Sequence, residues 1–207
     1  MQPNNRPRII GITGSIGSGK TTVSKIIEAD YPVYYADTIA HQVLELDQVK
    51  NKLLSRWGEA ILDKEKVNRK AIADIVFENQ TELTFLNSIV HPEVLISMQD
   101  IVNKSRKDVV FFEVPLLFEA NLKSCFDLVV LIVAKKQVRI SRLQIRDHLS
   151  ESEIQNRIDA QKADAVKSKL ADLVITNDGT TTQLQDKVKQ FLETVPKLPY
   201  RDVSPFA

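Results

Sequence analysis

The fold is decided by the stretch Gly14-Ser15-Ile16-Gly17-Ser18-Gly19-Lys20-Thr21, which has the spacing G-x-x-x-x-G-K-[ST] of a phosphate-binding loop. Three glycines let the backbone turn tightly, so that its N–H groups can approach phosphate oxygens. Lys20 adds a cation, and Thr21 adds a hydroxyl that can ligate Mg²⁺. The stretch therefore predicts a binding site for a nucleoside triphosphate.

The segments on either side of this loop support the prediction. Residues 8–13 form a short β-branched run that is typical of a buried strand. After the loop, Val23, Ile26 and Ile27 recur at helical spacing, so the helix N-terminus would point at the bound anion. A glycine-rich turn without a ligand is the alternative interpretation, and these flanks disfavour it.

Composition places the chain among ordinary globular proteins. It has 207 residues, 43% of them hydrophobic, and 28 basic against 27 acidic residues give a net charge of +1. We therefore expect neither a nucleic acid nor a membrane surface as partner, and favour small molecules. The single Cys125, the absence of a signal-peptide pattern and the absence of a long apolar run predict a cytoplasmic enzyme.

Strands alternate with helices along the chain, which predicts an α/β fold with a parallel sheet and right-handed crossovers. Two continuous apolar runs, 109–112 and 128–133, are typical of strands buried on both faces. We expect five strands, at 8–13, 33–36, 109–113, 128–133 and 172–176.

The region between the second and third strands reads as helical. A helix is expected over 38–57, with a break near Leu46-Asp47, and the stretch from Ile61 to Met98 contains no convincing strand. Asn68 can cap one helix, a second carries Phe85 and Leu86, and Pro92 would open a third. An insertion of this kind suggests a lobe that binds the second substrate.

Two acidic residues end predicted strands, at the sheet edge where ligands bind in open parallel sheets. Asp37 could accept the proton of an attacking hydroxyl or hold a metal-bound water, and its structural alternative is a helix N-cap. Glu113 could reach Mg²⁺ through water, and it could instead cap a helix. Phosphoryl transfer needs such groups beside the phosphate loop and the metal.

A basic helix lies between the fourth and fifth strands. Arg139, Arg142 and Arg146 fall on one face and could close over a triphosphate as a lid, although a solvated face is the plainer interpretation. Ser150 and Thr180 each begin a capping-box pattern for a following helix. His91 is the histidine best placed to act, and its alternative is a structural role.

Motifs along nearly the whole chain resemble the dephospho-coenzyme A kinase family. The P-L-L-F-E run and the H-P pair discriminate better than the phosphate loop does. The resemblance rests on residues 12–20, Ala36-Asp37-Thr38-Ile39-Ala40, Trp57-Gly58, Arg69-Lys70-Ala71-Ile72, Val76-Phe77, His91-Pro92, Val114-Pro115-Leu116-Leu117-Phe118-Glu119, Arg142-Leu143-Gln144-Ile145-Arg146 and Asn177-Asp178-Gly179.

This resemblance implies a three-layer P-loop kinase fold with a core at about 8–37, 106–135 and 170–195. It also implies a helical substrate lobe at about 60–104 and a lid at about 139–168. The implied reaction transfers the γ-phosphoryl group of ATP, with Mg²⁺, to the ribose 3′-hydroxyl of dephospho-coenzyme A. The implied partners are these two substrates, and the protein would be a monomer or a weak homo-oligomer.

The resemblance also implies roles for individual residues. The catalytic residues would be Asp37, Lys20 and Arg146, and the metal ligands Thr21 and Asp37, with Glu113 acting through water. Dephospho-coenzyme A would be bound by Asp37, Arg69, His91, Pro115 and Leu116. ATP would be bound by Gly14, Ser15, Ile16, Gly17, Ser18, Gly19, Lys20, Thr21, Thr22, Arg142, Arg146 and Asn177.

The chain departs from the family pattern at two positions. Tyr35 stands where many members have an acid, and Ser15 stands where many have a second glycine. From the residues alone, two other functions stay open. One is a different small P-loop kinase acting on a nucleoside monophosphate or a small alcohol, and the other is a nucleotide-binding module without an acceptor.

Overall fold

A computed structural model describes residues 6–77, 79–204 and 206 of the chain, which forms two compact units. The first, here called the sheet unit, comprises Met1–Tyr35 and Lys104–Pro205. The second, the helical unit, comprises Ala36–Asn103 and Phe206–Ala207. Within the part of the chain that the structure describes, no helix is long and apolar enough to cross a membrane.

The sheet unit is built on a five-stranded sheet in which every neighbouring pair is parallel, as the sequence predicts. Its strand order is β2-β5-β1-β6-β7. The boundaries differ from the prediction by one residue at β1, β2 and β7. The strands are β1 (Arg8–Gly14), β2 (Val33–Tyr35), β5 (Val109–Glu113), β6 (Leu128–Val133) and β7 (Leu173–Thr176).

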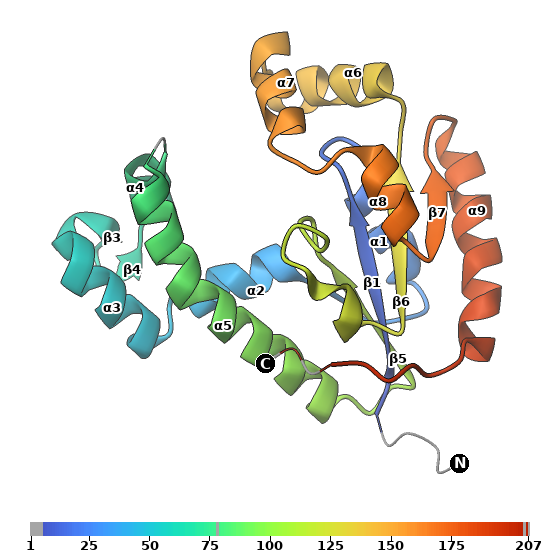
Figure 1. Ribbon diagram of the computed structural model, residues 1–207, viewed down its shortest axis with the longest axis horizontal. Helices are drawn as coiled ribbons and strands as arrows, with labels where there is room; N and C mark the ends of the chain where they lie inside the picture. Colours follow the sequence, from blue (N-terminus) through green and yellow to red (C-terminus); the bar gives the residue numbers. More distant parts are fainter. Residues whose placement is uncertain (1–5, 78, 205, 207) are drawn as a thin grey trace. The chain divides into compact units, whose positions relative to one another are not determined.

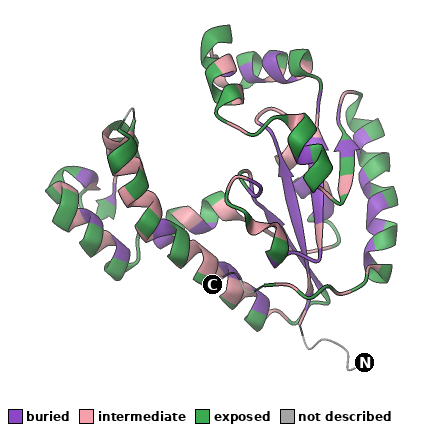
Figure 2. Cartoon of the chain, viewed as in Figure 1, coloured by how far each residue is buried: buried purple, intermediate pink, exposed green. Residues whose placement is uncertain are grey.

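Helices α1 (Lys20–Ile27) and α9 (Thr181–Thr194) cover one face of this sheet (Figure 1), and their apolar side chains join those of the strands in one core. Figure 2 shows the central strands buried along most of their length. On the other face, the segment after β5 packs so closely that a Cβ added at Gly11 would meet Leu117 and Phe126. The sheet is therefore the middle layer of three.

The remaining helices of the sheet unit lie between β5 and β7 and after α9. Both predicted capping boxes form, with Ser150 accepting from the Glu153 N–H and Thr180 accepting from the Gln183 N–H. The elements are η2 (Leu122–Cys125), α6 (Lys136–Asp147), α7 (Glu151–Asp159), α8 (Asp164–Leu170) and η3 (Val195–Lys197).

The helical unit contains four α-helices, one short 3₁₀ helix and a small hairpin within its described residues. These elements are α2 (Ala36–Val43), α3 (Asp47–Trp57), η1 (Gly58–Ile61), β3 (Leu62–Asp63), β4 (Lys66–Val67), α4 (Arg69–Val76) and α5 (Gln80–Lys104). The predicted break near residue 46 is confirmed, because α2 ends at Val43 and α3 begins at Asp47. The predicted Asn68 cap is also confirmed, because Asn68 accepts from the Lys70 and Ala71 N–H groups.

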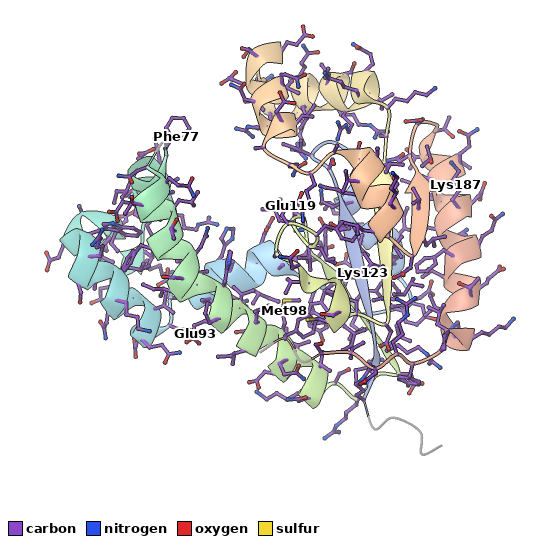
Figure 3. The ribbon with its side chains drawn as sticks, viewed as in Figure 1. Phe77, Glu93, Met98, Glu119, Lys123 and Lys187 are labelled. Atoms are coloured by element: carbon purple, nitrogen blue, oxygen red, sulfur yellow. The ribbon has the colours of Figure 1, made fainter. Side chains whose placement is uncertain are left out.

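Trp57 fixes the end of α3 within this unit. Its ring meets Phe85 edge to face with 5.5 Å between centroids, and its indole N–H donates to Glu82 Oε2 at 2.7 Å. The next residue, Gly58, has a φ of 67°, a conformation that glycine adopts readily, and it ends the helix as predicted. Phe77 follows the last residue of α4 and is 75% exposed (Figure 3).

Two expectations for this region are wrong. A short antiparallel hairpin, β3 with β4, lies where no strand was predicted, because its strands are too short to show a period and Lys64 takes the turn conformation with a φ of 58°. Helix α5 also runs through Pro92, so neither Pro92 nor His91 begins a helix. Burial of Val90 and Met98 on either side of Pro92 offsets a helix-breaking cost of about 3 kcal/mol.

Candidate functional site

The phosphate loop joins β1 to α1 and has the backbone that its glycines allow. Gly17 has a φ of 77° and Gly19 a φ of 95°, and Gly19 is the N-cap residue of α1. Lys20, the first residue of that helix, donates from Nζ to the carbonyl oxygens of Gly14 at 2.8 Å and Ser15 at 3.4 Å. Its ammonium is thereby held across the loop, beside the N–H groups at the helix start.

Glu113 ends β5 and is hydrogen-bonded to side chains of α1. Its Oε1 accepts from the Thr21 hydroxyl at 3.0 Å, and its buried Oε2 accepts from the Ser24 hydroxyl at 2.6 Å. The carboxylate therefore joins the end of a strand to the first turns of α1 through side chains, and does not cap that helix. Sequence reasoning missed Ser24, although its place on the buried face of an amphipathic helix was a signal.

Thr21 and Glu113 fit a hard divalent cation. A hydroxyl and a carboxylate are oxygen donors of the kind that Mg²⁺ accepts together with substrate phosphates. Within residues 6–77, 79–204 and 206, no group of three His, Cys, Asp or Glu side chains is arranged to hold a metal by itself. The donors thus suit a cation whose other ligands are phosphate and water.

Tyr35 is paired with Glu113 in the sheet register. It stands at the position where many members of the family have an acidic residue. Its hydroxyl donates to Glu28 Oε1 at 2.8 Å. Burial raises the pKa of this hydroxyl, and the hydrogen bond to Glu28 raises it further, so Tyr35 keeps its proton at neutral pH. Position 35 therefore holds a neutral donor and no carboxylate for a metal.

A cavity of about 430 Å³ lies over the phosphate loop and brings together most of the predicted nucleotide-binding residues. Arg142 Nη2 donates to the Asn177 carbonyl oxygen at 3.0 Å, and Asn177 Nδ2 donates to the Ser18 carbonyl oxygen at 2.8 Å. The cavity is lined by Gly17, Gly19, Lys20, Thr21, Thr22, Arg142, Leu143, Ile145, Arg146, Asn177, Gly179, Thr181 and Leu184.

The three arginines of α6 do not form one solvated row. Arg139 is 5% exposed and lies 3.3 Å from Asp164, whereas Arg142 is half-buried against the loop. Arg146 is exposed and pairs with Asp147 at 2.7 Å, and this hydrogen bond lowers the pKa of the Asp147 carboxyl. Of the three, Arg142 and Arg146 line the cavity.

The helical unit carries three of the predicted acceptor-side residues, namely Asp37, Arg69 and His91. Asp37 is exposed in the first turn of α2, one residue beyond the helix start, so it is not the N-cap. Arg69 begins α4, and its Nη1 lies 2.7 Å from Nδ1 and 2.9 Å from Nε2 of His41. His41 is exposed and follows Asp37 by four residues on the same face of α2.

The other predicted substrate residues are placed separately. His91 is exposed on α5 in the helical unit. Pro115 and Leu116 follow β5 in the sheet unit, where the Pro115 carbonyl oxygen accepts from the Thr13 hydroxyl at 3.3 Å. Leu116 is 48% exposed.

A parallel sheet with a phosphate loop after β1, a hydroxyl–carboxylate pair beside it and arginines over it defines a P-loop kinase. Residues 8–183 match the sequence model of the dephospho-CoA kinase family. The chain belongs to the dephospho-CoA kinase family.

Individual relatives agree with this assignment. A dephospho-CoA kinase of Fusobacterium nucleatum is 37% identical over 189 residues, which cover 90% of this chain and 98% of the relative. A Thermus thermophilus crystal structure matches with a TM-score of 0.81 at 33% identity, covering 91% of this chain and 98% of the other. A dephospho-CoA kinase structure from Campylobacter jejuni has a TM-score of 0.70 at 27% identity, with 91% and 97% covered.

Proposed function

We propose that this protein transfers the γ-phosphoryl group of ATP to the ribose 3′-hydroxyl of dephospho-coenzyme A, giving coenzyme A and ADP. This is the last step of coenzyme A biosynthesis. The observation that carries the proposal is the cavity over the phosphate loop, where Lys20, Thr21, Arg142 and Asn177 converge, in a chain of this family.

The donor side of the site is built in the sheet unit. ATP phosphates would meet the N–H groups of residues 14–22 and the ammonium of Lys20, which then leaves the carbonyl oxygens it now contacts. Arg142 and Arg146 would neutralise charge on the moving phosphoryl group. Asn177, whose side chain donates to the Ser18 carbonyl oxygen of the loop, would contact the adenine.

Mg²⁺ would be held by Thr21, with Glu113 acting through water and Asp37 as a further ligand. When bound, the metal would neutralise negative charge on the transferred phosphoryl group. Glu113 accepts the Thr21 hydroxyl hydrogen, which keeps the hydroxyl oxygen lone pairs available to the cation.

On the acceptor side, Asp37 would take the proton of the 3′-hydroxyl. The hydroxyl oxygen forms a bond to the γ-phosphorus, the bond from that phosphorus to the β,γ-bridging oxygen breaks, and ADP leaves with the electron pair. Arg69 would bind acidic groups of the acceptor, beside His41. His91, Pro115 and Leu116 would also contact the acceptor.

The proposal extends to organisation and location. We assign the kinase core to about 8–37, 106–135 and 170–195, the substrate lobe to about 60–104 and the lid to about 139–168. The protein would act in the cytoplasm, as a monomer or weak homo-oligomer, without nucleic acid or membrane partners. A net charge of +1 supports the last point.

An acceptor screen tests the proposed function. Purified protein with Mg-ATP is incubated with dephospho-coenzyme A, a set of nucleoside monophosphates and small alcohols, and the products are identified by mass spectrometry. We expect 3′-phosphorylated product from dephospho-coenzyme A alone. Phosphorylation of a nucleoside monophosphate instead, or ATP hydrolysis without a phosphorylated acceptor, would contradict the proposal.

A further inference from the structure

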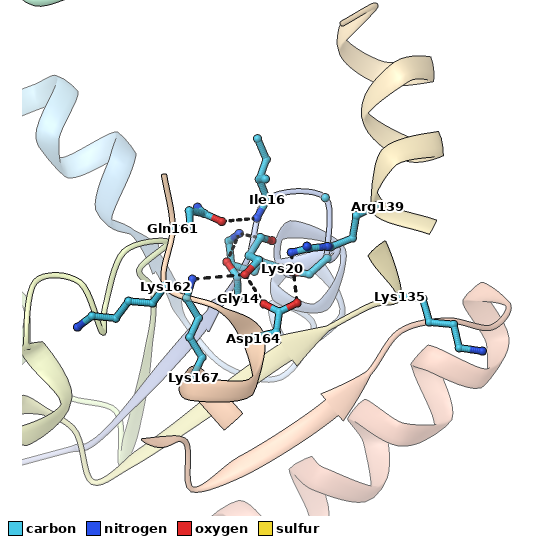
Figure 4. A network of polar contacts seen from close by, with 12 residues as sticks. Gly14, Ile16, Lys20, Lys135, Arg139, Gln161, Lys162, Asp164 and Lys167 are labelled. Atoms are coloured by element: carbon cyan, nitrogen blue, oxygen red, sulfur yellow. Dashed lines mark hydrogen bonds and ion pairs between the residues drawn. The ribbon is translucent and has the colours of Figure 1, made fainter. Parts of the chain in front are cut away.

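A largely buried polar network joins the phosphate loop to helix α8 (Figure 4). The Ser15 hydroxyl donates to Asp164 Oδ1, and Asp164 Oδ2 lies 3.3 Å from Nη1 of Arg139. Lys167 Nζ lies 3.4 Å from Ser15 Oγ and 3.0 Å from Glu119 Oε1. The network therefore connects the loop, the first turn of α6, α8 and the segment after β5.

Two residues of this network are buried, so their polar groups need hydrogen-bonding partners within the protein. Lys167 is 0% exposed and Ser15 3% exposed. A buried ammonium destabilises the fold strongly unless it is paired and hydrogen-bonded. Burial opposes ionisation of Glu119, but the hydrogen bonds from Lys167 and from the Lys162 N–H outweigh it and lower the pKa of this carboxyl. Glu119 is therefore the anionic partner of Lys167 at neutral pH.

A second set of contacts runs beside the first, just before α8. Gln161 Oε1 accepts from the Ile16 N–H at 2.9 Å. The Lys162 N–H donates to Glu119 Oε1 at 3.0 Å, and Lys162 Nζ donates to the Phe118 carbonyl oxygen at 2.5 Å. Phosphate-loop residues 15 and 16 are thus both held by residues 161–167.

These groups act on the loop from outside the nucleotide cavity. Gly17 and Lys20 of the loop are among the described residues that line the cavity. Asp164 and Lys167 do not line it. Ser15 connects the two sets, because its hydroxyl is in the network while its carbonyl oxygen accepts from Lys20. A change at α8 would therefore reach the phosphate-binding groups through Ser15.

We propose that Asp164 and Lys167 are positioning residues of the phosphate loop: through the Ser15 hydroxyl they hold the loop in the shape that binds ATP. A glycine at position 15 offers no hydroxyl, so this chain gains a side-chain contact that glycine lacks. The loop then loses less conformational freedom when ATP binds, since part of its order is already in place. This inference rests on the proposed ATP site.

The test uses Ser15→Ala and Asp164→Asn, singly and together, in the full chain. We expect each single change to raise the Kd and KM for ATP roughly tenfold, because a buried hydrogen bond to a charged group is lost. The kcat at saturating ATP should change much less. The double variant should bind ATP no more weakly than the worse single variant, since both changes remove the same contact.

Lys167 is tested with two variants because an unpaired Glu119 could prevent folding. Lys167→Met removes the buried ammonium, and Lys167→Met with Glu119→Gln removes both charges. We expect the double variant to fold and to bind ATP roughly tenfold more weakly than the wild type. Lys169→Met is the control, because Lys169 is exposed on the same helix, and its ATP affinity should not change.

A purely structural role predicts a different pattern. If the folded variants melt at lower temperature but keep the wild-type Kd and KM for ATP, the inference is wrong. Failure of the proposed function is recognised separately, because the wild type would then give no 3′-phosphorylated product from dephospho-coenzyme A, and failure of the ATP site because the wild type would bind no ATP. Wild-type protein that binds ATP, with variants that bind it equally well, overturns the positioning role alone.

Discussion

At the scale of single residues, Glu113, which we propose to support the metal, is hydrogen-bonded to the helix that follows the phosphate loop. Its two carboxylate oxygens accept from two hydroxyls of α1 and leave little freedom for the side chain. A carboxylate fixed in this way can orient a metal-bound water without moving. The amide of a glutamine has the same shape but lacks the charge.

Glu113→Gln should therefore weaken the use of Mg²⁺ more than it alters the fold. We expect the Mg²⁺ concentration for half-maximal activity to rise roughly tenfold, in keeping with the effect of losing a group that supports a metal site. Activity measured over a range of Mg²⁺ concentrations, with thermal melting as a control for folding, checks this. An unchanged Mg²⁺ dependence would assign Glu113 a structural role only.

Asp37→Asn should lower turnover far more than it weakens ATP binding. The loss of a general base is expected to reduce kcat by roughly 100-fold or more, because the acceptor hydroxyl keeps its proton. ATP affinity measured by titration should stay near the wild-type value. Asp47→Asn is the matched control, since Asp47 is also exposed in the first turn of a helix of the same unit.

At the scale of elements, caps set where the helices begin and thereby where functional side chains stand. Asn68 accepts from the first N–H groups of α4, and Arg69 is the first residue of that helix. Ser150 caps α7 in the sheet unit in the same way. The two caps thus offer a comparison between a helix with a proposed substrate residue and one without.

Asn68→Ala should destabilise the protein by about 1 kcal/mol and raise the KM for dephospho-coenzyme A, because the start of α4 frays. The KM for ATP should stay unchanged. Ser150→Ala should cost a similar free energy of unfolding without the change in acceptor KM. Steady-state kinetics on both variants check this, and equal acceptor KM values would refute the link between cap and substrate.

Asp127 is hydrogen-bonded to β1 and to residues near both the N-terminal and the C-terminal ends of the chain. Its buried carboxylate accepts from Arg6 and from the N–H groups of Ile9 and Arg201. Burial opposes ionisation, but these hydrogen bonds outweigh it and lower the pKa of this carboxyl. The stabilising contribution is therefore complete above the ordinary aspartate pKa of about 4 and is lost as the pH falls through the lower folded-state value.

Asp127→Asn should lower the free energy of unfolding at pH 7 by about 3 kcal/mol, because buried donors lose a charged acceptor. The variant should also lose less stability than the wild type between pH 4 and pH 2. Denaturant unfolding measured across this range checks both points. Parallel acid profiles for the two proteins would contradict the assigned pKa shift.

At the scale of the whole molecule, local patterns predicted the sheet and its ligand-binding edge. The apolar runs at 109–112 and 128–133 are buried strands, and the glycine spacing at 14–19 yields the loop with its two left-handed glycines. Ser150 and Thr180 cap their helices because capping depends on residues three apart in sequence. These features need no knowledge of distant contacts.

What the sequence did not predict depends on contacts between distant residues. Ser15 meets Asp164 and Lys167 across about 150 positions, and Thr21 and Ser24 meet Glu113 across about 90, so spacing carries no trace of them. Helix α5 runs through Pro92 because burial on both sides outweighs a local penalty. The plainer interpretation put Arg139 on a solvated helix face. It is buried instead, beside Asp164 of another helix.

The chain's aromatic residues divide between the units in a way that gives each its own optical signal. Trp57, the single tryptophan, belongs to the helical unit and touches Phe85 and Glu82 there. All four tyrosines, Tyr31, Tyr34, Tyr35 and Tyr200, belong to the sheet unit. Tryptophan fluorescence of the unmodified protein therefore reports on the helical unit alone, and its emission can follow changes in the unit that carries most of the proposed acceptor residues without any attached label.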